Sequence, residues 1–393
     1  MSRRERRKKP RSRGSRVERV GGFLREYTAG FNTRDLQRLF DRDAAQAYAV
    51  LTREHAREPE PRGRVSRMFF RTRLAFLGIS YKLSPSRRLL FALAILLFVV
   101  GLLQDPLQFT AHGRTVSLEF SPLWFLGAMA IMAFLLALEL VDRVRVRDEL
   151  EVARELQADL LPQAAPQLAG WRFAHSYRTA VEVGGDYYDF TPLPDGRLAL
   201  AVGDASGHGM AAGLVMAIAN AVLKTALDLD PAPAAVAALL NRTLCRTGTR
   251  RTFLSLFYAL LDPATGRLEY IGAGHPFPLL LRRDGTIEEL GKGGLPLGLR
   301  QPLAPATGEA TLAPGDILVL FTDGLVEATD PQGERAFGFE RLSALVRPGG
   351  SPQTIHDRVL AAFDAHVGGE PLRDDLTLVV IGREPGAVAP ASD

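Results

Sequence analysis

Two long apolar stretches constrain this chain more than any other feature of its sequence. They run from Leu89 to Leu103 and from Leu123 to Leu138, and neither carries a polar face. Neighbouring apolar residues extend both toward the roughly 20 residues with which a helix crosses the hydrocarbon core of a bilayer. The alternative is a pair of helices buried in a globular core, since such helices are also apolar all round. We favour membrane spans and predict two of them, joined by a short external loop, within residues 87–141.

The arginines that flank these stretches predict their orientation. Arg87 and Arg88 precede the first stretch, three arginines at 143–147 follow the second, and the loop 104–122 carries one arginine, Arg114. Because basic residues collect on the cytoplasmic side, both termini and the region after the second span are expected in the cytoplasm. The chain is thus predicted to be a multi-pass protein of the inner, cytoplasmic membrane. Its external loop is too short to be a folded sensor domain.

Residues 1–86 are predicted to be a cytoplasmic N-terminal region without visible chemistry. The first 19 residues are rich in arginine and lysine, although the whole chain has a net charge of only +4. We interpret this run as a solvated basic tail and not as a nucleic-acid-binding segment. Apolar residues at three- and four-residue steps predict an amphipathic helix over 33–56. The single cysteine, Cys245, excludes an internal disulfide and suits a reducing compartment.

A charged helical pattern follows the second apolar stretch. Over residues 142–165, apolar side chains fall on roughly one stripe among charged ones, and the pattern ends near Pro162. It predicts a linker helix that leaves the membrane. Such a helix can pair with its own copy as a coiled coil in a homodimer, and an ordinary surface helix is the alternative.

The texture of the sequence changes from about residue 166. Short β-rich runs such as "RLALAVGD", "TFLSLFYALLD", "RLEYIGAGH", "PLLLRR", "DILVLFTDG" and "LTLVVIG" are separated by glycine, proline and aspartate. Helical patterns interrupt them at 210–227, 232–245 and 352–366. Hairpin-like turns at 263–266 and 284–285 favour antiparallel sheets covered by helices. We therefore predict an α+β catalytic domain over 166–384, followed by a disordered tail at 385–393.

Four acidic motifs are spread through this domain. A lone aspartate beside glycine is usually a turn residue, but several carboxylates at strand ends are the ligands that Mg²⁺ or Mn²⁺ selects. Two such ions, about 3.5–4 Å apart, activate a water and clamp an in-line displacement at phosphorus. The glycines of "GDASGHG" would let the main chain approach the metals and the phosphate. The motifs are "EVGGDYYDF" with Asp186, "AVGDASGHG" with Asp204, "LVLFTDGLVEA" with Asp323, and "LRDDLTLVV" with Asp374 and Asp375.

Several of these segments resemble one known family. "VGGDYYDF", "VGDASGHGMAAGLVMA", "FLSLFYALLDPATGRLEYIGAGHPFPLLL", "GLPLGL" and "DDLTLVVI" are similar, in this order, to the SpoIIE/RsbU branch of the metal-dependent PPM (type 2C) serine/threonine phosphatases. The resemblance covers about residues 156–382 and includes the "ELQADLLPQ" helix. It implies a four-layer αββα sandwich over 166–384, two Mn²⁺ or Mg²⁺ ions, and removal of phosphate from a protein serine or threonine.

The resemblance also assigns roles to single positions. Asp204 matches the ligand that bridges both metals, and Ala205 matches a ligand that acts through its main-chain carbonyl. Asp323 and Asp374 match the remaining direct ligands of one metal, and Asp186 matches the acid that holds the second. The resemblance therefore implies that Asp204 and Asp323 are the catalytic residues.

Two positions depart from the eukaryotic enzymes of this class. Their phosphate-binding arginine and the histidine two residues after the bridging aspartate have no evident counterpart here. We therefore expect His208 to cap the helix that follows it, and His275 to be a structural turn residue. Phosphate would be held by the metals, with help from the segment Gly207, His208 and Gly209 at a helix N-terminus.

The function that this pattern favours is a membrane-anchored protein phosphatase. By resemblance, its substrate would be a phosphorylated anti-anti-sigma factor, a small STAS-domain protein. A catalytically silent membrane-bound scaffold that binds the same partner is one alternative. A nucleotide cyclase, which also joins membrane helices to a two-metal aspartate site, is another, but it leaves the "SGHG" and "AGH" segments unexplained.

Overall fold

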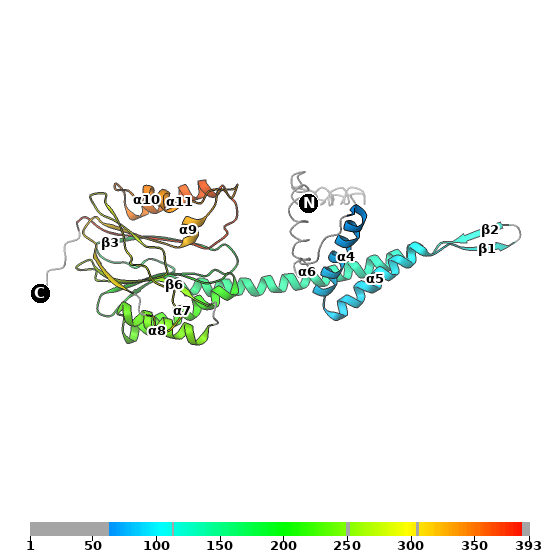
Figure 1. The fold of residues 1–393 in the computed structure, drawn as a ribbon, viewed down its shortest axis with the longest axis horizontal. Coiled ribbons are helices and arrows are strands. Elements are labelled where there is room, and N and C mark those ends of the chain that lie inside the picture. The colour runs from blue at the N-terminus through cyan, green and yellow to red at the C-terminus, as the bar shows by residue number, and fades with distance from the viewer. Residues whose placement is uncertain (1–62, 112–113, 249–251, 304–305, 387–393) are drawn as a thin grey trace, which may run out of the picture. The chain divides into compact units, whose positions relative to one another are not determined.

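The computed structural model describes residues 63–111, 114–248, 252–303 and 306–386. The basic tail, the helix expected over 33–56 and the last residues of the expected C-terminal tail lie outside these ranges. The chain divides into two compact units, Met1–Asp142 and Arg143–Asp393. Figure 1 shows both units.

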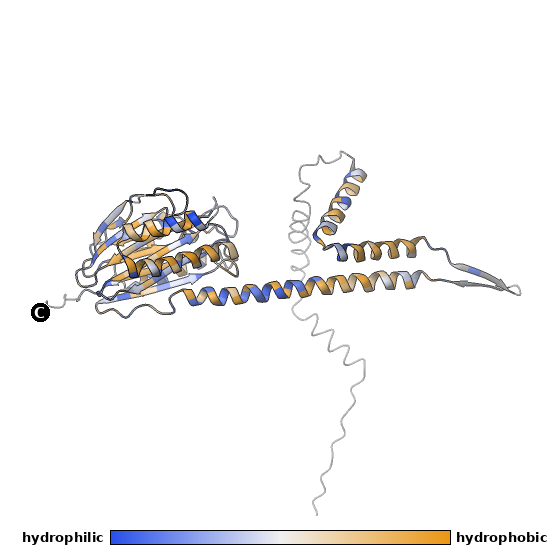
Figure 2. Ribbon diagram, turned by 90° about the horizontal axis from the view of Figure 1, so that it is seen from below, coloured by the Kyte–Doolittle hydropathy of each residue, from blue (hydrophilic) through white to orange (hydrophobic). Residues whose placement is uncertain are grey.

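The first unit holds the apolar stretches in two long helices. Helix α5 (Pro85–Leu103) and the first part of α6 (Ser121–Leu160) are long and apolar enough to cross a membrane. They approach closely at Gly101, where an added Cβ would lie 3.1 Å from Trp124 and Phe125. At their other end the Arg87 guanidinium lies 2.7 Å from the Asp142 carboxylate. Figure 2 shows α5 and the start of α6 as almost unbroken apolar ribbon, whereas the rest of α6 alternates.

The segment between the two apolar helices is a β-hairpin. Strand β1 (Leu107–Ala111) pairs antiparallel with β2 (Arg114–Leu118) in full register. The sequence predicts only a short loop here, because neither five-residue run is strongly apolar. A lone two-stranded hairpin is marginally stable in water. The structure therefore adds an ordered element to the loop without making it a separate folded domain.

A third helix, α7 (Met210–Leu229), is also apolar and long enough to span a membrane by composition alone. It belongs to the second unit, and 44% of its apolar window is buried there, against 11% for each of the other two candidates. Its buried residues include Met216 and Leu223, which join the main core. We conclude that α7 is a core helix.

The second unit is a sandwich of two antiparallel five-stranded sheets, as predicted. The first sheet has the order β10-β7-β6-β5-β4 and the second β3-β12-β11-β8-β9. Helices α7 and α8 (Pro233–Thr247) cover the first sheet, and α10 (Phe339–Leu345) and α11 (Pro352–Val367) cover the second (Figure 1). The strands are β3 (Trp171–Arg178), β4 (Asp186–Pro192), β5 (Leu198–Ala205), β6 (Leu254–Leu261), β7 (Arg267–Ala273), β8 (Leu279–Leu281), β9 (Ile287–Glu289), β10 (Thr307–Thr311), β11 (Ile317–Phe321) and β12 (Leu376–Arg383).

The central strands are apolar on both faces because each lies between the opposite sheet and a helical layer. All residues of β6 and β12 are buried, and β5 is buried except at Asp204. A strand covered on both faces reads as a continuous apolar run instead of an alternating one. One core cluster fills the space between the sheets and under α7 and α8, and a second lies between the second sheet and α11.

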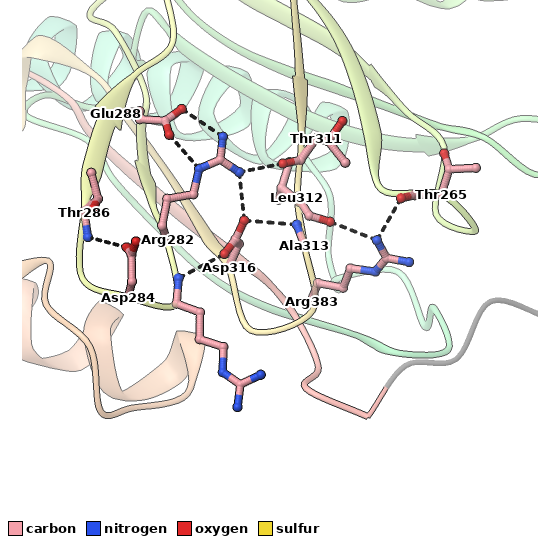
Figure 3. A network of polar contacts seen from close by, with 11 residues as sticks. Thr265, Arg282, Asp284, Thr286, Glu288, Thr311, Leu312, Ala313, Asp316 and Arg383 are labelled. Atoms are coloured by element: carbon pink, nitrogen blue, oxygen red, sulfur yellow. Dashed lines mark hydrogen bonds and ion pairs between the residues drawn. The ribbon is translucent and has the colours of Figure 1, made fainter.

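One end of the sandwich is closed by a polar network (Figure 3). The Arg282 guanidinium, after β8, contacts the Asp316 carboxylate at 2.9 Å and the Thr311 carbonyl of the first sheet at 2.6 Å. Arg383, at the end of β12, donates to the carbonyl of Thr265, in the turn between β6 and β7, at 2.8 Å and to that of Leu312, directly after β10, at 2.9 Å. These bonds tie the two sheets together where β11 begins and β12 ends. The acidic motifs lie at the other end of these strands.

Candidate metal centre

Strand pairing gathers the acidic motifs at one end of the sandwich. Asp186, the first residue of β4, is the register partner of Asp204 near the end of β5. Asp323 follows the end of β11, and Asp374 immediately precedes Asp375 and the start of β12. Because β11 and β12 are antiparallel, the end of one lies beside the start of the other. Carboxylates up to 188 positions apart in the sequence numbering, from Asp186 to Asp374, therefore share one end of the fold.

The carboxylates lie close enough to affect one another's ionisation. Burial first, and then three neighbouring carboxylates, raise the pKa of Asp204 to about 8. Those neighbours are Asp323, Asp374 and Asp375. Asp374 is exposed as a residue, but partial shielding of its carboxyl group from water, and then the charge of Asp323, raise its pKa as well. Such a concentration of negative charge disfavours the ionised forms, and a cation among them would reverse this.

Asp186 is held between the two sheets by a pair of threonines. Its carboxylate is 1% exposed, and burial raises its pKa. Thr322 and Thr377, from the second sheet, both donate hydroxyl hydrogen bonds to its Oδ2 atom, at 2.7 and 2.6 Å. The Thr377 N–H in turn donates to the Thr322 hydroxyl at 2.9 Å. These bonds offset part of the burial cost of the carboxylate, and sequence reasoning missed both threonines.

The neighbouring acids Asp374 and Asp375 have different surroundings. Both oxygens of the buried Asp375 accept main-chain hydrogen bonds, from the N–H of Ala180 at 2.8 Å and of Gly185 at 2.5 Å. Asp374 is exposed, and its Oδ1 atom accepts from the Asp375 N–H at 2.9 Å. Asp375 thus holds the loop before Asp186 in place. These contacts favour Asp374 as the metal ligand of the pair.

The main chain packs closely beside Asp204. A Cβ atom on Gly185 would lie 2.8 Å from the Ala205 carbonyl oxygen and 3.2 Å from Asp204 Oδ1. Glycine at this position therefore allows the loop to pack directly against a carbonyl and a carboxylate oxygen. Hard cations such as Mg²⁺ take oxygen ligands of both kinds, so the donor set fits such an ion by its chemistry. Within the described parts of the chain, however, no three His, Cys, Asp or Glu side chains stand close enough together to hold a metal.

The glycine-rich segment after Asp204 differs from its predicted role in one respect. The expectation that His208 caps α7 is wrong, because Gly209 occupies the N-cap position and no side chain caps the helix there. His208 is exposed, and its charge lowers the pKa of Asp374, although burial raises that pKa more. Gly207 and Gly209 have φ of 101° and 65°, in the left-handed region that favours glycine. The predicted phosphate contact by this segment stays a prediction.

His275 is part of the packing beneath the acidic end. Its Nδ1 atom lies 2.9 Å from the hydroxyl of Ser255, and Ser255 is the register partner of Asp204 on β6. Burial lowers the pKa of His275 to about 3, so the ring is neutral near pH 7. The structural turn role expected of His275 stays a prediction.

The C-terminal part of α6 reaches the same loop as Asp375. The buried Gln157 amide donates from Nε2 to the Gly184 carbonyl at 2.6 Å and accepts from the Gly184 N–H at 2.9 Å. On the next turn, Asn220 of α7 donates to the Leu160 carbonyl at 2.9 Å. The loop that leads into Asp186 is thereby clamped from the linker helix on one side and from Asp375 on the other. The residue pattern of α6 alone shows no sign of this clamp.

We expect Gln157→Leu to destabilise the second unit by about 2–6 kcal/mol, because it leaves two buried peptide groups of Gly184 unpaired at about 1–3 kcal/mol each. Thermal unfolding of the full chain measures this change. The matched control is Gln163→Leu, since Gln163 donates to the Ala158 carbonyl from an exposed position. Equal unfolding temperatures for the two variants would contradict the clamp.

Comparisons with known proteins agree with this architecture. A family model described as Stage II sporulation protein E (SpoIIE) matches residues 194–384. Protein IcfG of Synechocystis is 27% identical over 277 residues, which cover 63% of this chain and 43% of IcfG. Phosphoserine phosphatase RsbU of Bacillus subtilis is 27% identical over 244 residues, 61% of this chain and 71% of RsbU. This chain thus spans less than half of IcfG.

A solved structure shows the same fold. The SiaA-PP2C domain of Pseudomonas aeruginosa superposes with a TM-score of 0.55 at 23% sequence identity. The superposition covers 62% of this chain and 98% of that domain. The αββα architecture predicted for the second unit is therefore confirmed.

Proposed function

Because this chain carries a PPM-type phosphatase domain of the SpoIIE family, homologous to RsbU, we propose that it is a membrane-anchored, metal-dependent protein serine/threonine phosphatase. The observation that carries the proposal is that four carboxylates converge at one end of the sandwich: Asp186, Asp204, Asp323 and Asp374. Burial and the charges of neighbouring carboxylates raise the pKa values of Asp204 and Asp374 there. An uncompensated cluster of this kind destabilises a fold unless a cation binds there.

We assign the residues of the site to two roles, metal binding and phosphate binding. Asp204, the Ala205 carbonyl, Asp323, Asp374 and Asp186 would hold two Mn²⁺ or Mg²⁺ ions. When bound, such a pair supplies an activated water and stabilises the transferred phosphoryl group. Asp186 is held in one orientation by its two threonines, and Asp375 and Gln157 hold the loop that leads to it.

Phosphate would meet the segment that begins α7. The main-chain N–H groups at Gly207 and Gly209 precede a helix of 20 residues, whose N-terminus favours anions. The exposed side chain of His208 stands beside this segment, near Asp374. We assign these residues to orienting the phosphomonoester.

The partner and location complete the proposal. The name of RsbU, phosphoserine phosphatase, supports a phosphoserine or phosphothreonine substrate, and we propose a phosphorylated anti-anti-sigma factor with a STAS domain. Helix α5 and the first part of α6 would anchor the chain in the cytoplasmic membrane, with both termini and the phosphatase domain in the cytoplasm. The linker part of α6 would serve as the contact in a homodimer.

One observation favours a second candidate, the catalytically silent scaffold. The acidic side chains lie within electrostatic reach of one another but, over the described residues, no three are spaced to hold a metal. A scaffold would bind the same phosphorylated partner without turnover. Turnover assays separate the two candidates directly.

The test is release of phosphate by the full chain in detergent, from an aryl phosphate and from phosphorylated STAS proteins. We expect activity with Mn²⁺ or Mg²⁺ and none with a chelator. Because the pKa of Asp204 is raised to about 8, protons compete with the metal below that pH. The half-saturating metal concentration should therefore fall as pH rises from about 6 to about 8, by about tenfold per pH unit if one proton is displaced.

Binding of the phosphorylated partner without any phosphate release, with every divalent ion tried, would contradict the phosphatase and support the scaffold. A metal requirement that does not change with pH would show that Asp204 is not among the groups that release a proton to the metal.

A further inference from the structure

Helix α4 (Arg64–Lys82), which precedes the first apolar span, exposes a strip of large apolar side chains. They recur at three- and four-residue steps and therefore share one face of the helix. Their exposed fractions lie between 39% and 73%, which is high for side chains of this kind. The strip consists of Val65, Met68, Phe69, Phe76 and Ile79.

The same helix carries only positive charge. It contains four arginines and one lysine and no acidic residue: Arg64, Arg67, Arg71, Arg73 and Lys82. Arg67 and Arg73 are exposed. At about 100° per residue, Arg73 on one side and Lys82 on the other flank the apolar strip, whereas Arg67 lies on the opposite face of the helix. A helix that combines these two faces is amphipathic and cationic.

Helix α4 contacts α5 through its C-terminal half. The Arg88 guanidinium of α5 donates to the Ser80 carbonyl at 2.9 Å and lies over the Tyr81 ring, 5.2 Å from its centroid. Phe76 stacks on Phe91 with ring centroids 5.7 Å apart. Both views of the molecule show α4 turning away from the line of α5 (Figure 1, Figure 2). Phe76 thus belongs both to the strip and to the contact with α5, whereas Val65, Met68 and Phe69 are 63–73% exposed.

The place of α4 in the chain puts this strip at one surface of the bilayer. Leu83 and Ser84 alone separate α4 from α5, and Arg87 and Arg88 mark the cytoplasmic end of the span by the distribution of basic residues. A helix with an apolar strip flanked by cations lies in the boundary between headgroups and acyl chains. Cations near a cytoplasmic surface are attracted by its anionic lipids.

We propose that α4 lies in the cytoplasmic interface of the membrane, with its apolar strip among the acyl chains and its arginines on anionic lipid headgroups. This assignment goes beyond the phosphatase activity and holds whether or not the second unit turns over substrate. It depends on the continuity of α4 with the membrane span α5 and on the charge of its exposed side chains.

The first experiment places a fluorescent label on the full chain in lipid vesicles. The only native cysteine is removed by Cys245→Ser, and an environment-sensitive label is attached after Phe69→Cys on the strip or Ser66→Cys off it. In phosphatidylcholine vesicles with phosphatidylglycerol, lipid-borne quenchers should quench the label at 69 and not the label at 66. A label after Leu96→Cys, on the exposed face of α5, should be quenched in every vesicle.

The second experiment tests the charges. Removing phosphatidylglycerol should lower the ratio of buried to exposed label at 69. Arg67→Gln with Arg73→Gln should lower it as well, by about fivefold for each cation removed. The control variant, Arg242→Gln with Arg347→Gln, removes the same charge from exposed positions of the second unit and should leave the ratio unchanged.

Three results would overturn the assignment. A label at 69 that is water-exposed while the label at 96 is quenched shows that α5 enters the bilayer without α4. A label at 69 that is shielded equally in detergent and in vesicles, and is not reached by lipid quenchers, shows that protein covers the strip. Absence of quenching at 96 shows that the predicted span itself is wrong.

Discussion

Asp323→Asn is expected to abolish phosphate release while leaving the fold intact. The substitution keeps the shape of the side chain and removes its charge, so a carboxylate ligand becomes a neutral amide. Loss of an outer partner of a metal ligand typically costs about 10–100-fold in metal affinity or activity, and loss of a direct ligand should exceed that. Phosphate release with saturating Mn²⁺ and calorimetric titration of Mn²⁺ measure the two effects.

The same substitution should not weaken the metal-free protein. Burial, and then the charge of Glu327, raise the pKa of Asp323, so its ionised form is disfavoured in the fold. Removing that charge should leave the unfolding temperature unchanged or higher. Asp228→Asn, at an exposed position of α7, is the matched control for charge alone. Turnover by Asp323→Asn within tenfold of the unmodified chain would contradict a direct role of Asp323.

Gly324→Ala is expected to unfold or displace the acidic end of the sandwich. A Cβ atom at Gly324 would lie 1.9 Å from the Asp375 carbonyl oxygen and 2.9 Å from its carbonyl carbon. Both contacts are main chain, so helix α9 (Asp323–Glu327) would have to move away from the segment before β12. We expect at least the roughly 1–3 kcal/mol that overpacking a core costs, together with loss of phosphate release.

Gly272→Ala is the control for this substitution. Gly272 lies in β7, and nothing stands within 4 Å of its added Cβ. The exchange should be neutral, or it should stabilise the fold by about 0.4–1 kcal/mol, because alanine lowers the conformational entropy of the unfolded chain. Chemical unfolding of the two variants provides the comparison. Similar stability and activity for both would show that the contact at Gly324 relaxes without effect on the site.

The strands that the sequence predicts are those in the middle of the sheets. Strands β5, β6, β7, β8, β11 and β12 all correspond to apolar runs in the sequence. The four strands that no apolar run predicts are the edges of the two sheets: β3, β4, β9 and β10. An edge strand has one neighbour and more polar side chains, as in "WRFAHSYR" of β3 and "TGEAT" of β10. Its composition therefore resembles that of a loop.

The acidic residues of the candidate site could be predicted because each stands beside glycine or at the end of an apolar run. The residues that hold these acids and their loop in place could not be predicted. Thr322 and Gln157 act through hydrogen bonds to segments 136 and 27 residues away, and no local pattern records such a bond. The expected cap at His208 failed for a related reason, since Gly209 alone can adopt the left-handed backbone at that position.

The two ends of the sandwich differ in how their buried carboxylates are compensated. At the end drawn in Figure 3, the buried Asp316 carboxylate is matched by Arg282 and by two peptide N–H groups. At the other end, Asp204 has carboxylates for neighbours. The contacts that join the two sheets at the end drawn in Figure 3 therefore need no divalent ion. A chelating buffer should abolish phosphate release and lower the stability of the acidic end, where the carboxylates stay uncompensated, while the contact between Arg282 and Asp316 at the other end stays formed.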